Sequence, residues 1–363
     1  MTQIGRYIVG AELGRGGMGA VYTARDPGLD RHVAIKVIAP ELARDPAFVS
    51  RFLREVRIAA TLEHPNVVPV YEAGESDRTL YMVMRLIPGQ TLQDAIDDHG
   101  ALAPERAAAL GRQLGSALDA AHSRGLVHRD VKPANVLLSR SGDQEHLFLA
   151  DFGLARDAAS TSGVTETGQW IGTVDFVAPE ILNQSGQASA RSDVYSMSCP
   201  LFQSLTGRVP YAGPVARKLA GHAVEPLPSI GHAFQNAPAI DAVLARGAAK
   251  DPADRFPSAG ELAAAFDDAV NARRAAPRGM VAPTVLDTAP QAARAPVLSS
   301  SDAADVAPGR SSHRGRVVAA AVAALALAAG AGPAAGLPRR DKRQKRGTAR
   351  TPALPSRKAR RCQ

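Results

Sequence analysis

Hydrophobic and polar positions change their period along the chain, and this change predicts a fold in two parts. Up to about residue 90 the pattern mostly alternates, as in AVYT and RHVAIKVIA, which predicts strands. The stretch DPAFVSRFLREVRIAATL (45–62) instead repeats apolar residues every three or four positions, which predicts one helix. After residue 90 helical spacing dominates, with short strands predicted around 127–151. We therefore expect a lobe of strands with one helix, followed by a mainly helical lobe.

A glycine-rich stretch, LGRGGMGAVYTARD (13–26), carries the spacing G-x-G-x-x-G at Gly14, Gly16 and Gly19. Both dinucleotide-binding folds and protein kinases use such glycines where the backbone approaches phosphoryl oxygens. The alternating pattern after Gly19 predicts a hairpin, whereas a dinucleotide loop opens a helix. A dinucleotide fold also needs an acidic residue about twenty positions further on. That position falls in RHVAIKVIA, which contains Lys36 and no acidic residue. The sequence therefore favours a hairpin over a dinucleotide-binding loop.

Charge is distributed unevenly, and this changes the meaning of the formal net charge of +8. Acidic residues outnumber basic ones up to about residue 270, and basic residues dominate beyond it.

Only Cys199 and Cys362 occur, which favours a reducing compartment over a disulfide framework. The N-terminal residues lack the basic and apolar regions of a signal peptide, so we expect the first domain in the cytoplasm.

The C-terminal part differs in composition from the rest of the chain. Residues 269–316 are rich in Ala, Pro, Ser and Arg, which predicts a disordered linker. Residues 317–337 carry no charge and have the length of a single transmembrane helix. Their many alanines are barely favourable in lipid, and their glycines and Pro333 weaken a helix. More basic residues follow this segment than precede it, which conflicts with a cytoplasmic domain on its N-terminal side. Spanning the membrane and contact with its surface therefore both remain open.

Candidate chemistry appears in three further stretches. VAIK places Lys36 on a strand behind the glycine loop, and Glu55 lies on the apolar stripe of the predicted helix, with Phe48, Phe52 and Ala59. A carboxylate on such a stripe needs a cationic partner, and Lys36 is the natural one. LVHRDVKPANVLL (126–138) is expected to form a strand, a polar turn and a second strand, and LFLADFGLA (147–155) ends another apolar run with an aspartate.

Taken together, these motifs resemble those of the protein kinases of the Ser/Thr class. GRGGMGAV, the VAIK lysine, HRDVKPAN, DFG and APE occur in the family's order over about residues 7–268. The resemblance implies the α+β fold of a kinase, with an N-terminal lobe of sheet plus one helix and a mainly helical C-terminal lobe. It leaves 269–316 as the linker, 317–337 as the candidate transmembrane helix and 338–363 as a basic, disordered tail.

The resemblance also implies roles for individual residues in transferring phosphate from ATP. Asp130 would accept the proton of the substrate hydroxyl, Lys132 would steady the γ-phosphate, and Lys36, held by Glu55, would pair with the α- and β-phosphates. Asn135 and Asp151 would hold Mg²⁺ or Mn²⁺. The residues implied in ATP binding are Leu13, Gly14, Arg15, Gly16, Gly17, Gly19, Val21, Ala34, Lys36, Met84 and Leu86.

Regulation is implied by the arginine that precedes the catalytic aspartate. Such an arginine, here Arg129, commonly needs a phosphate on the activation loop to neutralise it. Thr165 and Thr167 lie where related bacterial kinases phosphorylate themselves, and Thr173 is expected to bridge the catalytic aspartate and lysine instead. We therefore expect autophosphorylation in this loop.

Structural roles are implied for three more charged residues. Glu180 of APE and Arg255 of KDPADRF would form a buried ion pair, and Asp193 of SDVYS would brace the catalytic loop.

The helix that begins at SDVYS departs from the family at Pro200, and an interior proline costs about 3 kcal/mol or more. This predicts a kinked or less stable helix and keeps open a second hypothesis, a weak or inactive homologue that acts as an ATP-binding scaffold.

The expected partners follow from these two hypotheses. An active kinase requires protein substrates with Ser or Thr, and a homodimer is compatible with the sequence without being indicated by it. The basic tail is expected to be attracted to anionic membrane lipid. Nucleic-acid binding is disfavoured, because no aromatic residue interleaves the basic ones.

Overall fold

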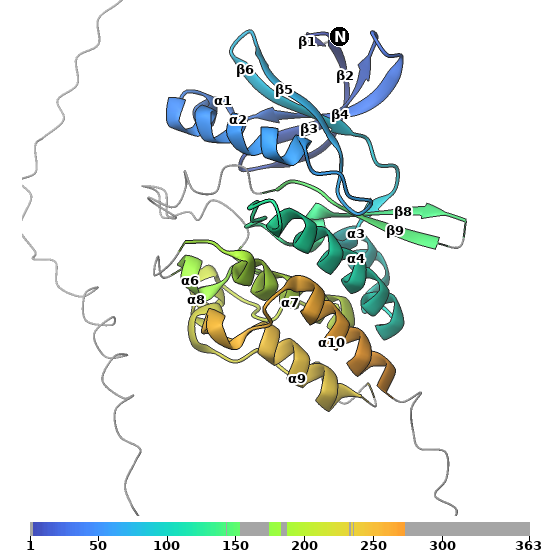
Figure 1. Ribbon diagram of the computed structural model, residues 1–363, viewed down its shortest axis with the longest axis vertical. Helices are drawn as coiled ribbons and strands as arrows, with labels where there is room; N and C mark the ends of the chain where they lie inside the picture. Colours follow the sequence, from blue (N-terminus) through green and yellow to red (C-terminus); the bar gives the residue numbers. More distant parts are fainter. Residues whose placement is uncertain are drawn as a thin grey trace, which may run out of the picture. The chain divides into compact units, whose positions relative to one another are not determined.

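The computed structural model describes residues 3–142, 144–152, 174–182, 187–231, 234 and 236–272. All of them lie in the first of the two units into which the chain divides, Met1–Pro283 and Thr284–Gln363. This part of the chain forms a lobe of strands followed by a lobe of helices (Figure 1). The predicted α+β, two-lobed architecture is confirmed.

Six antiparallel strands form the sheet of the N-terminal lobe, in the order β1-β2-β3-β4-β6-β5. They are β1 (Gln3–Ile4), β2 (Tyr7–Gly16), β3 (Gly19–Asp26), β4 (Arg31–Ile38), β5 (Val70–Ser76) and β6 (Thr79–Arg85). Side chains alternate between the two faces, so Val33 and Ile35 of β4 join one hydrophobic cluster and Ala34 and Ile38 join the other. Lys36 shares the parity of Ala34 and Ile38 and therefore lies on their face.

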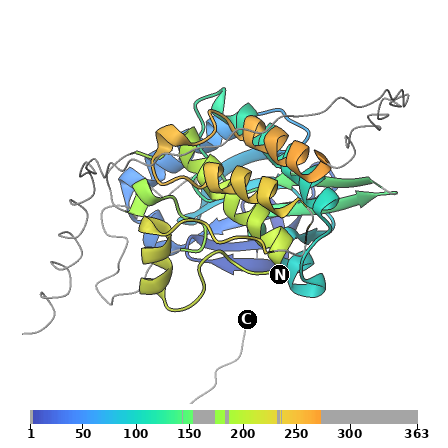
Figure 2. The same ribbon diagram turned by 90° about the horizontal axis from the view of Figure 1, so that it is seen from below.

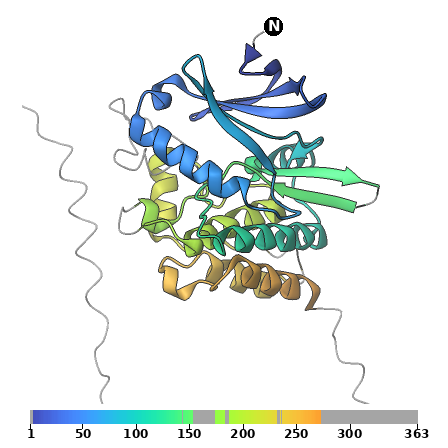
Figure 3. The same ribbon diagram turned by 45° about the horizontal axis from the view of Figure 1, so that its top comes forward.

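Two helices follow β4, the short α1 (Pro40–Ala43) and the longer α2 (Pro46–Ala60). The α2 helix begins where the Asp45 side chain accepts a hydrogen bond from the backbone N–H of Ala47 at 2.9 Å, with proline at the first helical position. It covers the face of the sheet that carries Lys36 (Figure 3). The predicted apolar stripe is confirmed, because Phe48, Phe52, Glu55, Val56 and Ala59 are the buried residues of this helix.

A second, small sheet has the order β7-β8-β9 and follows the first in the chain. Its strands are β7 (Gln90–Thr91), β8 (Val136–Ser141) and β9 (Gln144–Leu149), and β8 and β9 form the hairpin on the right of Figure 1. The strand expected around residues 126–128, before the predicted catalytic turn (128–135), is not formed. The backbone N–H of His128 donates instead to the side chain of Asp193, so a side chain takes the place of a neighbouring strand.

Helices build the C-terminal lobe. The α-helices are α3 (Leu92–His99), α4 (Pro104–His122), α6 (Pro179–Leu182), α7 (Ala190–Thr206), α8 (Val215–Val224), α9 (Ala237–Gly247) and α10 (Ala259–Asn271), and the 3₁₀ turns are η1 (Pro133–Asn135) and η2 (Pro252–Asp254). Figure 2 shows α9 and α10 from below. The α4 and α10 helices approach closely at Gly115, where a Cβ would lie 2.8 Å from the carbonyl oxygen of Ala259.

The central helix α7 runs through Pro200 without interruption. A capping box at Ser189 begins it, and Gly207 ends it in the left-handed region with φ 70°. Most of its residues are buried, so tertiary packing holds the helix despite the hydrogen bond that proline cannot donate to Ser196. The helix is therefore not broken at Pro200, and the expected cost in stability stays a prediction.

No helix within the described ranges has the length and apolar character needed to cross a membrane. The segment proposed to do so, residues 317–337, lies outside those ranges.

Candidate active site

The glycine loop forms the turn of the β2–β3 hairpin, with Gly16 paired to Gly19, as the sequence predicts. Gly19 has φ 137°, and a Cβ there would lie 1.9 Å from the carbonyl oxygen of Val37, so only glycine fits. At Gly14 and Gly16 an added Cβ would meet nothing within 4 Å. Packing within the protein does not explain these two glycines, whereas close approach to a phosphate would.

Several expected ATP-contacting residues lie on one face of the sheet. Val21 pairs with Lys36 and Ala34 with Met84 across neighbouring strands, and cross-strand partners point to the same side. Ala34 and Met84 are buried, and Leu86 is half-buried just beyond β6. Together they form a mostly apolar wall beside an ammonium group.

Two other residues of the predicted nucleotide set differ in character. The Leu13 side chain is exposed, at 53% of its full accessible area. Arg15 is committed to an ion pair with Glu12 and a hydrogen bond to Tyr22 at 3.1 Å. Because these contacts occupy the side chain of Arg15, its backbone is the part that can face a nucleotide.

The catalytic turn brings three predicted residues together. Lys132 Nζ lies 2.7 Å from Asp130 Oδ2, and Asn135 Nδ2 donates to the same oxygen at 3.1 Å and to the backbone oxygen of Asp130 at 2.8 Å. The Lys132 ammonium and the Asn135 amide N–H both contact the carboxylate of Asp130 and favour its ionised form, which is the form that accepts a proton.

The turn is anchored from below by Asp193, at the start of α7. Its carboxylate, which is fully buried, accepts from the backbone N–H of His128 at 2.7 Å and of Arg129 at 2.8 Å. His122 Nε2 contributes a third contact of 2.7 Å. Asp193 therefore holds the turn as expected, whereas sequence reasoning missed His122, whose position at the end of α4 gave no chemical signal.

His128 links the turn to the strand that leads to Asp151. It is fully buried, with Nε2 3.0 Å from the carbonyl oxygen of Ala150 and Nδ1 3.2 Å from the backbone N–H of Asp130. Because Nδ1 accepts from an N–H and Nε2 faces a carbonyl, the neutral Nε2–H tautomer fits. Burial lowers the pKa of His128, which keeps the ring neutral.

Asp151 is paired and strained at the edge of the same site. Lys36 Nζ lies 2.9 Å from Asp151 Oδ2, while Oδ1 is buried without a hydrogen-bond partner among the described residues. Its φ of 57° lies in the left-handed region, which is rare for a residue other than glycine and often marks a functional site.

A metal ion fits the oxygens that this corner offers. Mg²⁺ prefers carboxylate and amide oxygens and retains water or phosphate as further ligands. Asp151 supplies the unpartnered Oδ1, and the donor contacts of the Asn135 amide nitrogen leave its oxygen as a second ligand. Among the described residues, no group of three or more His, Cys, Asp or Glu offers an alternative cluster.

The ion pairs of Lys36 and Glu55 differ from the expectation. Lys36 contacts Asp151, and Glu55 Oε1 instead lies 3.1 Å from Arg129 Nη1. In this arrangement Arg129 contributes positive charge at Glu55, and Lys36 contributes positive charge at Asp151.

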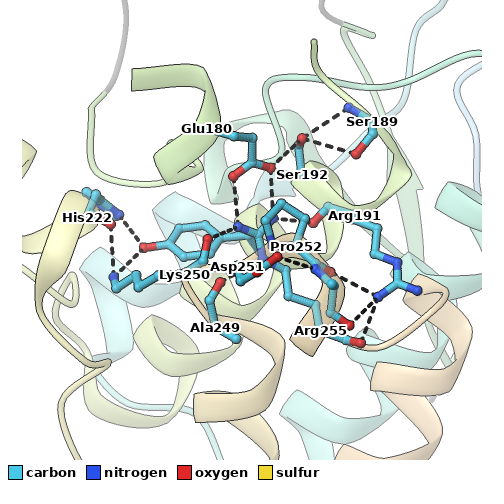
Figure 4. Close-up of polar contacts among 12 residues, drawn as sticks. Glu180, Ser189, Arg191, Ser192, His222, Ala249, Lys250, Asp251, Pro252 and Arg255 are labelled. Carbon is cyan, nitrogen blue, oxygen red and sulfur yellow. Dashed lines mark hydrogen bonds and ion pairs between the residues drawn. The ribbon is translucent and has the colours of Figure 1, made fainter. Parts of the chain in front are cut away.

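The predicted ion pair of Glu180 and Arg255 is present and buried (Figure 4). Both guanidinium nitrogens Nη1 and Nη2 contact the carboxylate at 2.8 Å, and Ser192 Oγ donates to it at 2.7 Å. Arg255 also donates to the backbone oxygens of Ala249, Arg191 and Lys250. Burial alone would raise the pKa of Glu180, but the hydrogen bonds from Arg255 and Ser192 outweigh it and lower that pKa.

The expected phosphorylation sites Thr165 and Thr167, and Thr173, lie outside the described residues, which omit 153–173.

Comparison with known proteins agrees with this geometry. The family model described as the protein kinase domain matches residues 7–251. The chain is 43% identical to the Ser/Thr-protein kinase PknE of Mycobacterium tuberculosis over 265 residues, which are 73% of this chain and 46% of the relative. It is 42% identical to the Ser/Thr-protein kinase PknD of the same species over 272 residues, 74% of this chain and 40% of the relative.

A solved structure gives the same result. The crystal structure of the PknI kinase domain of M. tuberculosis aligns with a TM-score of 0.60 and 32% identity, over 74% of this chain and 98% of that one. The chain therefore belongs to the protein kinase family, among bacterial kinases of the Ser/Thr type. It spans less than half the length of the curated relatives named here.

Proposed function

We propose that the chain is an active Ser/Thr protein kinase that transfers the γ-phosphate of ATP to hydroxyl groups of proteins. One contact above all supports this proposal. Ala150, next to Asp151, donates its backbone N–H to the carbonyl oxygen of Asn135 at 2.9 Å. This bond joins the turn that carries Asp130 and the metal-binding oxygen of Asn135 to the segment that carries Asp151.

In the proposed reaction the protein positions the groups and balances their charge. Asp130 Oδ accepts the proton of the substrate hydroxyl while the hydroxyl oxygen forms a bond to the γ-phosphorus. The bond from that phosphorus to the oxygen it shares with the β-phosphate breaks, and ADP leaves with the electron pair. Lys132, 2.7 Å from Asp130, is placed to neutralise charge on the transferred phosphoryl group.

Asp151 and Asn135 would hold Mg²⁺, which supplies charge neutralisation at the phosphates when bound. Lys36 would turn to the α- and β-phosphates, and Glu55 would then hold its ammonium group. The backbone of the β2–β3 turn would cover the phosphates, with Val21, Ala34 and Met84 beside the adenine.

The substrate class is tested with three peptides that differ only in a Ser, Thr or Tyr acceptor. Transfer of labelled phosphate to the Ser and Thr peptides, at rates well above that for Tyr, is expected. A preference for Tyr would contradict the assignment. An Asp130→Asn variant, which keeps the size of the side chain and removes the base, identifies any transfer by a contaminating kinase.

We also propose that the kinase phosphorylates Thr165 or Thr167 and so controls the pairing of Arg129. A phosphate carries nearly two negative charges and attracts an arginine more strongly than a single carboxylate does. Drawing Arg129 towards the phosphate would weaken its pair with Glu55 on α2, and Glu55 would then pair with Lys36. Asp151 would then be free to hold the metal.

The remaining proposals concern location and partners. We place the kinase domain in the cytoplasm, where ATP is available, and propose membrane association through residues 317–337 and the basic residues 338–363. Fractionation of the full chain with an alkaline carbonate wash distinguishes an inserted segment from surface contact. Light scattering of the purified chain measures its mass in solution and so tests for a homodimer.

A further inference from the structure

Asn66 is a buried polar residue outside the catalytic turn, with 7% of its area exposed. It follows α2 by six residues and precedes β5. Its amide nitrogen donates to Gln113 Oε1 at 2.9 Å and to the carbonyl oxygen of Leu147 at 2.9 Å. These partners belong to α4 and β9, so one side chain joins three segments that are distant in the sequence.

The geometry fixes the orientation of this amide. His146 Nε2 lies 2.9 Å from the carbonyl oxygen of Pro65, which only accepts, so Nε2 carries the proton. That nitrogen cannot also accept from Asn66 Nδ2, 3.4 Å away. The two amide protons of Asn66 therefore go to Gln113 and Leu147, and both are used.

Gln113 completes the connection from α4. Its Oε1 also accepts from the backbone N–H of Leu147 at 2.8 Å, and its Nε2 donates to the carbonyl oxygen of Glu145 at 3.2 Å. Both backbone groups of Leu147 are thus held by side chains. Since β9 is an edge strand of its sheet, these groups would otherwise lack a partner.

Two residues further along β9, the backbone groups of Leu149 are bonded to other backbone groups. Leu149 donates to the carbonyl oxygen of Asn66 at 2.8 Å and accepts from the N–H of Val68 at 2.9 Å. Ala150 then bonds to Asn135 and His128. The strand is therefore fixed residue by residue up to Asp151, whose carboxylate carries the unpartnered oxygen.

We propose that Asn66 and Gln113 are positioning residues for Asp151. They set where β9 ends relative to α2 and the catalytic turn, and so where the carboxylate of Asp151 meets a metal-bound nucleotide. This inference rests on the proposed function. A residue that orients a metal ligand is worth about 10- to 100-fold in metal affinity or activity.

The test measures how much Mg²⁺ increases the affinity of the full chain for a fluorescent ADP analogue, by titration with Mg²⁺ and with EDTA. Asn66→Ala and Gln113→Leu act on Asp151 through β9, so they are expected to reduce this gain by about tenfold, the lower end of the range, and to leave affinity in EDTA unchanged. Gln113→Glu keeps the oxygen that accepts from Asn66 and Leu147, so it should retain most of the gain.

A matched control is Asn236→Ala, which removes a side-chain donor to the carbonyl oxygen of Val270 at 3.0 Å, between α9 and α10. It should keep the full gain. The proposal is overturned if Asn66→Ala and Gln113→Leu keep the gain, or if Asn236→Ala loses it equally. If Asn66→Ala does not fold, the contrast between Gln113→Leu and Gln113→Glu decides.

The same titration separates this inference from the proposed function. A wild-type chain whose affinity does not rise with Mg²⁺ would contradict both. A gain in the wild type that survives both substitutions contradicts the positioning role alone.

Discussion

Glu55 of α2 and Arg129 of the catalytic turn form an ion pair, with Oε1 and Nη1 3.1 Å apart. The contact joins the helix of the N-terminal lobe to the residue before Asp130, the proposed base. Lys36 and Asp151 form the second pair of the same site, at 2.9 Å. In the proposed regulation, phosphorylation of the activation loop acts through an exchange of partners between these two pairs.

Replacing Arg129 by Gln should uncouple activity from loop phosphorylation, because no guanidinium then remains to exchange between Glu55 and the phosphate. In the wild type, autophosphorylated protein should be more active than phosphatase-treated protein by about tenfold, a usual size for such coupling. In the variant, the ratio of kcat/KM values should approach one. Arg124→Gln, at an exposed arginine near the same turn, is the control, and an equal ratio in Arg129→Gln and wild type would contradict the exchange.

Replacing Arg255 by Ala should strongly destabilise the C-terminal lobe. It leaves the carboxylate of Glu180 buried without its cation, which costs about 3–5 kcal/mol in free energy of unfolding. The matched control is Arg217→Ala, which breaks an exposed pair with Glu225 and should cost about 1 kcal/mol or less. Urea unfolding followed by circular dichroism measures both, and equal losses would refute the structural role of the buried pair.

Replacing Pro200 by Ala should stabilise the protein. The substitution restores the backbone N–H that can donate to the carbonyl oxygen of Ser196 and removes the proline ring, with an expected gain of about 1–3 kcal/mol. Part of the gain is offset by the smaller buried side chain. Thermal unfolding gives the result, and a lower unfolding temperature would mean that the packing of the ring outweighs the lost hydrogen bond.

Stability should fall as the pH is lowered from about 6.5 to about 4, partly through His222. Burial and the charge of Lys250 lower the pKa of His222 to about 4, from 6.5. Between these values the unfolded chain binds a proton and the folded chain does not, so unfolding is favoured by up to about 3 kcal/mol. His222→Gln should flatten this part of the pH profile, and an unchanged slope would contradict the assignment.

Local patterns in the sequence predicted much of the fold. The alternating residues of β3 and β4 and the stripe of α2 specify their faces directly, and the Glu180–Arg255 pair followed from motifs of the family. The prediction of a strand at residues 126–128 was wrong, because the backbone N–H of His128 donates to the side chain of Asp193, more than sixty residues away. No local pattern indicates such a partner.

The pairing within the site was harder to predict for the same reason. Spacing places Glu55 on a buried stripe but does not say whether Lys36 or Arg129 reaches it, since both cations come from other elements. Asn66 and Gln113 carried no signal at all, because an amide in a loop and one on a helix acquire meaning only where they meet β9.

Phosphate incorporation into the chain itself tests the kinase assignment most directly. The full-length protein is incubated with ATP and Mg²⁺, and its phosphorylated residues are mapped by mass spectrometry beside an Asp130→Asn control. We predict phosphate on Thr165 or Thr167 in the wild type and none in the control. A folded wild-type protein that binds ATP and gains no phosphate would contradict the account and favour a scaffold without catalytic activity.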